Sequence, residues 1–139
     1  MTTTQFKKGD KVIRFRRWND NGVWLWERLT IQSWGKKQGT ATQDNTDEFV
    51  EDRFYVDQVN NAPYRDHLYL ADGLDIEKVG LELAAAFLVY EIEAAKARIA
   101  RYSAQGYDVK SNEKELAALE AATPRIANRL DLVAELRVR

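Results

Sequence analysis

The chain has 139 residues, of which 45% are hydrophobic and 31% charged, with a formal net charge of −1 and no cysteine. This length suits one domain, or a small domain with an appendage, that folds without covalent cross-links. The absence of cysteine excludes a disulfide framework, a thiolate metal site and a cysteine nucleophile. The longest apolar run, 83–90, is too short to cross a bilayer, so we predict a soluble, cytoplasmic protein with no membrane partner.

The small net charge conceals a strong segregation along the chain. Residues 1–43 carry nine Lys or Arg against three acidic residues, residues 44–75 carry two against nine, and the remainder is balanced. One interpretation is a bipolar surface that attracts an anionic ligand at one end and a cationic partner at the other. The other, which we favour, is that the two segments fold side by side and neutralise each other.

Short β-prone runs alternate with turn clusters over residues 1–72. We predict strands at 11–17, 23–34, 39–43, around 53–56 and at 67–70, with turns at 8–10, 19–22, 35–38 and 60–63. Strands of this length and spacing favour a small antiparallel β-barrel or a bent sheet, of the SH3-like kind.

From residue 73 the composition changes to helix-forming residues. Asp75 is a predicted cap for a helix that ends near Gln105, where Gly106 supplies a left-handed stop. Asn112 and Glu115 have the spacing of a capping box for a second helix, which Thr123-Pro124 either kinks or restarts. The predicted fold class is therefore α+β, with the barrel or bent sheet at 1–72 and an α-helical hairpin at 73–139.

The helix predicted at 75–105 has two apolar stripes. The first stripe is Leu81, Ala85, Leu88, Ile92, Ala95, Ile99 and Tyr102, and the second is Ile76, Val79, Leu83, Phe87, Tyr90, Ala94 and Ala97. Each apolar stripe must pack against another part of the protein or against a partner. The barrel and the second helix, with Leu116, Leu119, Ile126, Leu130, Val133 and Leu136, can cover one or both; otherwise a second copy of the chain must, and we expect a homo-oligomer formed through helix 75–105.

The strand predicted at 23–34 has two faces of different chemistry, because alternate side chains point to opposite sides. One face carries Val23, Leu25, Glu27, Leu29, Ile31 and Ser33, and the other carries Trp24, Trp26, Arg28, Thr30, Gln32 and Trp34. The first face resembles a core. The second offers indole rings for stacking and a forked cation in the same row, which suits a flat anionic ligand.

Basic, aromatic and amide side chains of the first hairpin form the candidate binding site. The guanidinium groups suit phosphate, the indole rings a base, and the loop amide a ribose hydroxyl, so the combination fits a nucleotide or single-stranded nucleic acid. The candidate ligand-binding residues are Arg14, Arg16, Trp18, Asn19, Trp24, Trp26 and Arg28, with Arg98 and Arg101 from the helix. In the competing interpretation the row of tryptophans is the floor on which the first helix packs.

The chain contains few residues of the types that commonly act in catalysis. His67 is the only histidine, and no serine stands in a nucleophile-elbow pattern. The glycines form no phosphate-binding motif, and the acidic segment 44–57 lacks the loop spacing of a calcium site. We predict a non-enzymatic protein with no catalytic residue, no cofactor and no metal, in which the acidic segment is a solvated loop, a counter-charge for the basic hairpin, or a surface presented to a basic host protein.

Two stretches carry a resemblance to known families. Phe6-Lys7-Lys8-Gly9-Asp10-Lys11-Val12, followed by Leu29-Thr30-Ile31-Gln32-Ser33-Trp34-Gly35-Lys36-Lys37, resembles small barrels of the SH3, Tudor and KOW kind. The junction His67-Leu68-Tyr69-Leu70 before an acid-capped helix resembles accessory proteins of tailed bacteriophages. The overall plan is similar to the anti-Thoeris sponge proteins, which sequester a cyclic ADP-ribose signal and associate through their helices.

This resemblance implies a phage counter-defence protein in the host cytoplasm that sequesters a nucleotide-like anionic signal. The alternative is a nucleic-acid-binding or host-protein-binding inhibitor module built on the barrel. The resemblance carries over no individual site residue, so the candidate residues stand on their own chemistry.

Overall fold

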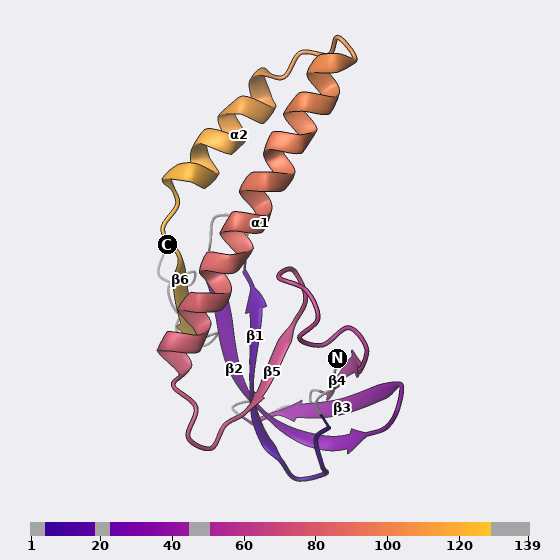
Figure 1. Cartoon of the computed structure of the whole chain (residues 1–139). Coiled ribbons are helices and arrows are strands. Elements are labelled where there is room, and N and C mark those ends of the chain that lie inside the picture. Colours follow the sequence, from indigo (N-terminus) through magenta and orange to yellow (C-terminus); the bar gives the residue numbers. More distant parts are fainter. Residues whose placement is uncertain (1–4, 19–22, 45–50, 129–139) are drawn as a thin grey trace.

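The computed structural model describes residues 5–18, 23–44 and 51–128, which form an α+β fold (Figure 1). The strands are β1 (Lys11–Arg17), β2 (Val23–Trp34), β3 (Gln38–Gln43), β4 (Glu51–Tyr55), β5 (His67–Leu70) and β6 (Arg125–Asn128). The helices are α1 (Ile76–Ala104) and α2 (Lys110–Ala121). The predicted order, a sheet followed by a helical hairpin, is confirmed.

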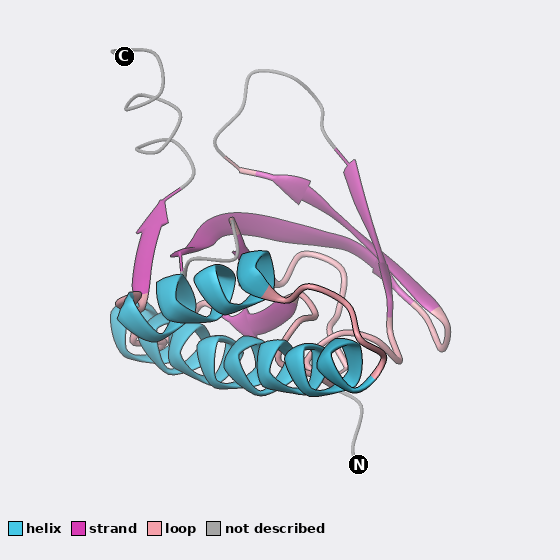
Figure 2. Cartoon of the chain, turned by 90° about the horizontal axis from the view of Figure 1, so that it is seen from above, coloured by secondary structure: helices cyan, strands magenta, loops and turns pink. Residues whose placement is uncertain are grey.

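The described strands form one open, strongly bent sheet (Figures 1 and 2). Antiparallel pairing gives the order β4-β3-β2-β1-β5, and β6 is added parallel to β2. The two edge strands do not pair with each other in the described part of the chain, so a closed SH3-like barrel is not confirmed. The bend nevertheless brings Phe54 of β4 and Leu68 of β5 into one core cluster.

The long strand β2 changes register between Ile31 and Ser33. A bulge of this kind adds a residue on one strand and turns the following side chains to the other face. Trp34 consequently packs in the core cluster that contains Ile31, with its ring centroid 4.9 Å from that of Phe6. The prediction that Trp34 shares a face with Trp24 is wrong, because strict alternation ignores the bulge.

The Trp34 ring explains why residue 39, opposite it on β3, is glycine. A Cβ atom at Gly39 would lie 2.0 Å from Trp34 Cε3, and the ring is held by its neighbours in the core. We expect Gly39→Ala to lower the free energy of unfolding by about 1–3 kcal/mol through overpacking. The matched change Gly35→Ala, where the nearest atom is 3.4 Å away, should stay within about 0.5 kcal/mol in urea denaturation. Equal losses in both variants would contradict this account.

Helix α1 packs its first half on one face of the sheet, called here the helix face. Ile13, Phe15 and Trp24 of the sheet are fully buried against Ala84 and Phe87 of α1. The helix approaches closely at buried Gly80, where a Cβ atom would lie within 3.0 Å of Ile126 and Phe15. As predicted, Asp75 caps the helix by accepting a hydrogen bond from the Lys78 amide, and Gly106 follows its end with φ at +81°.

The second half of α1 extends beyond the sheet and packs on α2 (Figure 1). Leu88 and Ala95 of α1 form a third core cluster with Leu119 of α2. The sheet therefore covers the part of α1 around Ala84 and Phe87, and α2 covers the part around Leu88 and Ala95. Leu81, Val89 and Tyr90 of α1 remain 36%, 63% and 40% exposed, and the homo-oligomer stays a prediction.

The C-terminal part of the described chain departs from expectation in two ways. Helix α2 begins at Lys110 without a side-chain cap, and Asn112 lies inside it, so the predicted capping box is wrong. After Pro124 the chain forms β6 beside β2, so the predicted helical continuation is also wrong. Ile126, expected on a helix, packs in this strand against the core of the helix face. Predicted helix positions Leu130, Val133 and Leu136 lie outside the described residues.

Within the described ranges, neither helix combines the length and apolar character needed to cross a membrane.

Candidate ligand pocket and its charge network

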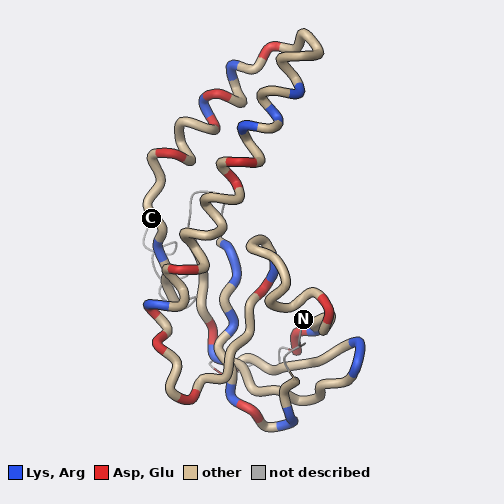
Figure 3. The backbone as a smooth tube through the Cα atoms, in the orientation of Figure 1, with Lys and Arg blue, Asp and Glu red and all other residues tan. Residues whose placement is uncertain are grey.

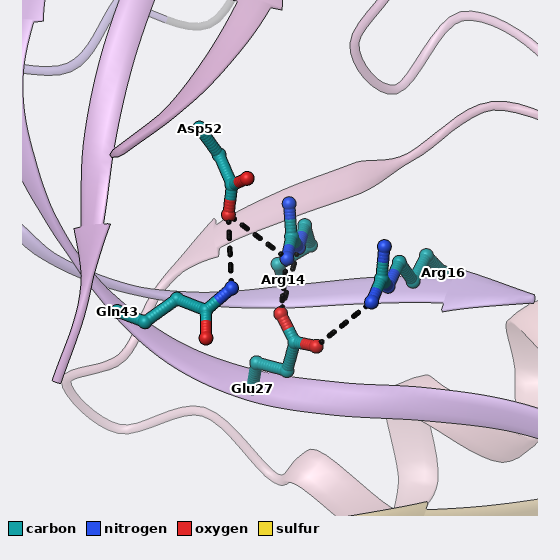
Figure 4. Close-up of polar contacts among 5 residues, drawn as sticks. All are labelled: Arg14, Arg16, Glu27, Gln43 and Asp52. Carbon is teal, nitrogen blue, oxygen red and sulfur yellow. Dashed lines mark hydrogen bonds and ion pairs between the residues drawn. The ribbon is translucent and has the colours of Figure 1, made fainter. Parts of the chain in front are cut away.

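The side chains of β1 on the face opposite α1 change from apolar to charged along the strand. Val12 belongs to the first core cluster, whereas Arg14 and Arg16 point toward a set of carboxylates (Figure 4). Arg14 is 3% exposed, and Glu27, which faces it across the β1–β2 ladder, is 5% exposed. Charges are rarely buried this deeply unless they are paired.

Arg14 is the centre of this network. Its Nε donates a hydrogen bond to Glu27 Oε2 at 3.0 Å, and its Nη2 also pairs with that oxygen. The same Nη2 lies 3.1 Å from Asp52 Oδ2 on β4, and the guanidinium stands over the Phe54 ring at 5.6 Å. Gln43 of β3 donates a hydrogen bond to Asp52 at 3.2 Å, so the network joins four strands.

These contacts decide between the two interpretations of the segregated charges. Asp52 pairs with Arg14, and Asp44 lies 3.6 Å from Lys11, so basic β1 and the acidic segment are ion-paired. Figure 3 shows basic and acidic residues interspersed over the same part of the fold. The prediction that the two segments neutralise each other is confirmed at these positions. Residues 45–50 of the acidic segment lie outside the described ranges.

Arg16 forms the exposed end of the network. Its Nη2 lies 3.3 Å from Glu27 Oε1, and its side chain is 35% exposed. Its Nε is buried and has no hydrogen-bond partner among the described residues. The unpaired donor of Arg16 is therefore enclosed by the protein, although the side chain as a whole is partly exposed.

A pocket of about 250 Å³ lies between β4 and the loop of residues 57–66. It is lined by Arg53, Phe54, Tyr55, Gln58, Val59, Tyr64, Arg65 and Asp66, a set that includes two arginines, two tyrosines and one aspartate. Arg65 is held in place because its guanidinium stands over the Tyr64 ring at 5.0 Å and its Nη1 donates to Gln58 Oε1 at 3.4 Å.

The 57–66 loop is anchored at both ends. The Asn60 side chain pairs with the backbone of Leu68 on β5, accepting from its N–H at 2.8 Å and donating to its carbonyl at 2.9 Å. Asn60 itself has φ at +63°, a conformation that asparagine tolerates better than most residues. The Tyr64 ring lies 5.3 Å from that of Tyr90 on α1. The pocket wall is thus tied to both the sheet and the helix.

Asp66 connects the pocket to the charge network. Burial raises the pKa of its carboxyl group above the ordinary value of 3.8, the positive charges of Arg14 and Arg16 oppose this, and the carboxylates of Glu27 and Asp52 add to it. Its contribution to stability therefore falls as the pH rises above 3.8 through the raised pKa, because the folded protein favours the neutral acid.

His67 lies in the core on the helix face, next to the rings of Trp24 and Tyr69. Burial lowers its pKa, opposed by the hydrogen bond between Nε2 and the Ala62 carbonyl at 3.1 Å. This imidazole, packed among aromatic rings, is part of the core on the helix face. Among the described residues, no group of three or more His, Cys, Asp or Glu side chains could hold a metal ion.

The structure distributes the residues predicted for the binding site over several places. Arg14 and Arg16 lie in the charge network, whereas Trp24 is fully buried on the helix face against Phe87, with ring centroids 5.8 Å apart. Trp24 is therefore inaccessible to a ligand, and the competing interpretation of an indole floor beneath the helix applies to it.

The other predicted site residues remain closer to solvent. Trp26 is half-buried with the Arg28 guanidinium 5.5 Å from its ring, and Trp18 is 43% exposed. Arg98 pairs with Glu115 of α2 at 3.2 Å, and the Arg101 guanidinium lies over the Tyr102 ring near the end of α1. Asn19 lies outside the described residues. The hairpin and helix residues do not form one site.

None of the residues that line this pocket was in the predicted site, including its charged and tyrosine residues Arg53, Tyr55, Tyr64, Arg65 and Asp66. They occur in a stretch with a large acidic excess, so its two arginines looked like interruptions of a counter-charge segment. The Tyr64-Arg65-Asp66 triplet between a turn cluster and a short strand was the available signal. Its meaning depends on how the loop folds back beside β4, the strand that directly precedes it in the chain.

A comparison with models of protein families finds no match, and none of the curated proteins or solved structures searched is significantly similar to the chain.

Proposed function

We propose that this protein binds a small nucleotide-like anion, without catalysis, in the pocket between β4 and the 57–66 loop. The observation that carries the proposal is the lining of this pocket, which combines Arg53 and Arg65 with Tyr55 and Tyr64. Guanidinium groups recognise phosphate or carboxylate by paired hydrogen bonds, and phenol rings offer stacking surface to a base.

The pocket is small and limits its ligand to at most about the size of one nucleotide. A volume of about 250 Å³ is just below the range of roughly 300–1,000 Å³ typical of small-molecule sites. Arg65 is already oriented by Tyr64 and Gln58, so little side-chain entropy is lost when it meets an anion.

Capture of a ligand, as in a sequestering counter-defence protein, needs only affinity. Arg14 is committed to Glu27 and Asp52, and His67 is a core residue, so neither is presented as an acid or base to a substrate. These placements support the non-enzymatic part of the proposal.

The first test is thermal shift and calorimetry with AMP, ADP, cyclic AMP and cyclic GMP. Binding to the native state should raise the melting temperature with ligand concentration. Arg65→Ala should weaken the affinity about 10- to 100-fold, because a hydrogen bond to a charged group contributes about 1.5–3 kcal/mol. If no nucleotide raises the melting temperature, the proposal fails.

Two control variants locate the site. Arg98→Ala removes a guanidinium that pairs with Glu115 on the helical hairpin, and it should leave affinity unchanged. Arg28→Ala removes the cation stacked on Trp26, on the part of the first hairpin predicted to bind. A loss of affinity in Arg28→Ala with none in Arg65→Ala would place the ligand on the hairpin and contradict the pocket assignment.

The alternative module, for nucleic acid or a host protein, predicts a different result. Binding of a single-stranded oligonucleotide should then fall steeply between low and physiological salt concentration. The pairing of Lys11 with Asp44 and of Arg14 with Asp52 reduces the net charge on both the basic and the acidic surface that such a module would use.

A further inference from the structure

We propose that the pocket takes up its anion together with a proton, and that the carboxyl group of Asp66 receives that proton. The inference rests on the proposed function and specifies how the site is regulated. It makes capture of the anion tighter in mildly acidic solution than in alkaline solution.

The position of Asp66 is the first argument. Asp66 is one of the residues that line the pocket together with Arg53 and Arg65, and its carboxyl group is close enough to the buried network centred on Arg14 to interact electrostatically with it. An anion held by the two pocket arginines therefore enters the surroundings of a carboxyl group that is itself largely removed from water. Two negative charges in such a place repel each other strongly unless one is neutralised.

The arginines near Asp66 do not remove the repulsion between its carboxylate and a bound anion, because other carboxylates already pair with them. Arg14 and Arg16 of β1 attract its carboxylate, but both are already paired with Glu27 of β2, and Arg14 also with Asp52 of β4. Glu27 and Asp52 repel the Asp66 carboxylate. Arg53 and Arg65 at the pocket are the cations that a bound anion would occupy.

The remaining titratable groups at this place are the phenols Tyr55 and Tyr64 of the pocket and the imidazole of the next residue, His67. The His67 imidazole is oriented away, with its ring beside Trp24 and Tyr69 on the helix face. Asp66 is thus the titratable group whose protonation a bound anion affects most directly.

Burial gives Asp66 a raised pKa in the free protein, and a neighbouring anion raises the pKa further. The complex then binds more protons than the free protein, and by linkage the affinity increases as the pH falls. For uptake of one proton the limiting dependence is about tenfold in affinity per pH unit.

The test is calorimetric titration of the full chain with cyclic AMP or cyclic GMP between pH 5 and 8. A phosphodiester keeps one negative charge over this range, so the ligand itself adds no pH dependence. Affinity should increase several-fold as the pH falls. Asp66→Asn should bind at pH 8 about as tightly as the unmodified protein at its acidic optimum, with little pH dependence.

Asp57→Asn is the matched control, because it removes an exposed carboxylate from the same loop and should preserve the pH dependence. Titrations of the unmodified protein in two buffers of different ionisation enthalpy count the proton directly, and they decide the matter even if the Asp66 variant fails to fold. We expect uptake of up to about one proton per ligand.

The outcomes separate this inference from the proposed function. Binding with no proton uptake, or with affinity that increases with pH, overturns the role of Asp66 and leaves the nucleotide site standing. The same holds if Asp66→Asn retains the full pH dependence. Absence of binding at every pH overturns the proposed function and this inference with it.

Discussion

Glu27→Ala should lower the free energy of unfolding by about 3–5 kcal/mol, because it leaves the buried Arg14 guanidinium without its main partner. Asp52 can compensate only in part, since it contacts the same Nη2 and is itself 29% exposed. Urea denaturation followed by fluorescence measures the change. Glu51→Ala, the loss of an exposed carboxylate on β4, should stay within about 0.5 kcal/mol.

Replacement of both partners tests whether the loss of stability in Glu27→Ala comes from an unpaired buried charge. In Arg14→Met/Glu27→Leu both charges are replaced by apolar side chains of similar length, a change that is often neutral or stabilising for buried ion pairs. We expect the double variant to recover most of the stability lost in Glu27→Ala. If it is as unstable as the single variant, the loss is not due to an unpaired buried charge.

Trp24→Ala should lower the free energy of unfolding by about 3–5 kcal/mol, the range for truncating a large buried aromatic side chain. Trp24 is fully buried, and its ring packs on those of Phe87 and His67, so its removal leaves a cavity between the sheet and α1. Denaturation by urea, with unfolding followed by circular dichroism, measures the loss independently of the missing indole fluorescence.

The control is Trp18→Ala, the same substitution at a side chain that is 43% exposed. It should change stability by about 0.5 kcal/mol or less. Similar losses at Trp18 and Trp24 would contradict the conclusion that α1 covers one tryptophan and leaves the other at the surface. Nucleotide affinity should be unaffected in Trp18→Ala if the ligand occupies the pocket beside Arg65.

Local signals in the sequence determined most elements of the fold. Alternating β-prone runs and turn clusters placed the first five strands, and Asp75 and Gly106 marked the limits of α1 closely. These features depend on nearest-neighbour chemistry, namely capping, left-handed glycine and period-two alternation, so they can be read without knowing what lies across the fold.

The errors have a common physical origin in long-range contacts. The bulge that turns Trp34 into the core exists only in the pairing of β2 with β3, and residues after Pro124 form a strand because β2 offers them a free edge. Neither partner strand is visible in the local pattern. Helix propensity and strict alternation therefore gave the wrong result at both places.

The sequence by itself determined which chemistry this protein has available: arginine and aromatic side chains, acidic counter-charges and few groups for catalysis. Only the tertiary structure decided which of them meet. Packing of α1 on the sheet buried Trp24, pairing across β1, β2 and β4 enclosed Arg14, and the 57–66 loop, tied to β5 through Asn60, folds back so that Arg65 and Asp66 lie beside β4. Burial and proximity depend on residues distant in the chain, and they separate a core side chain from a binding one.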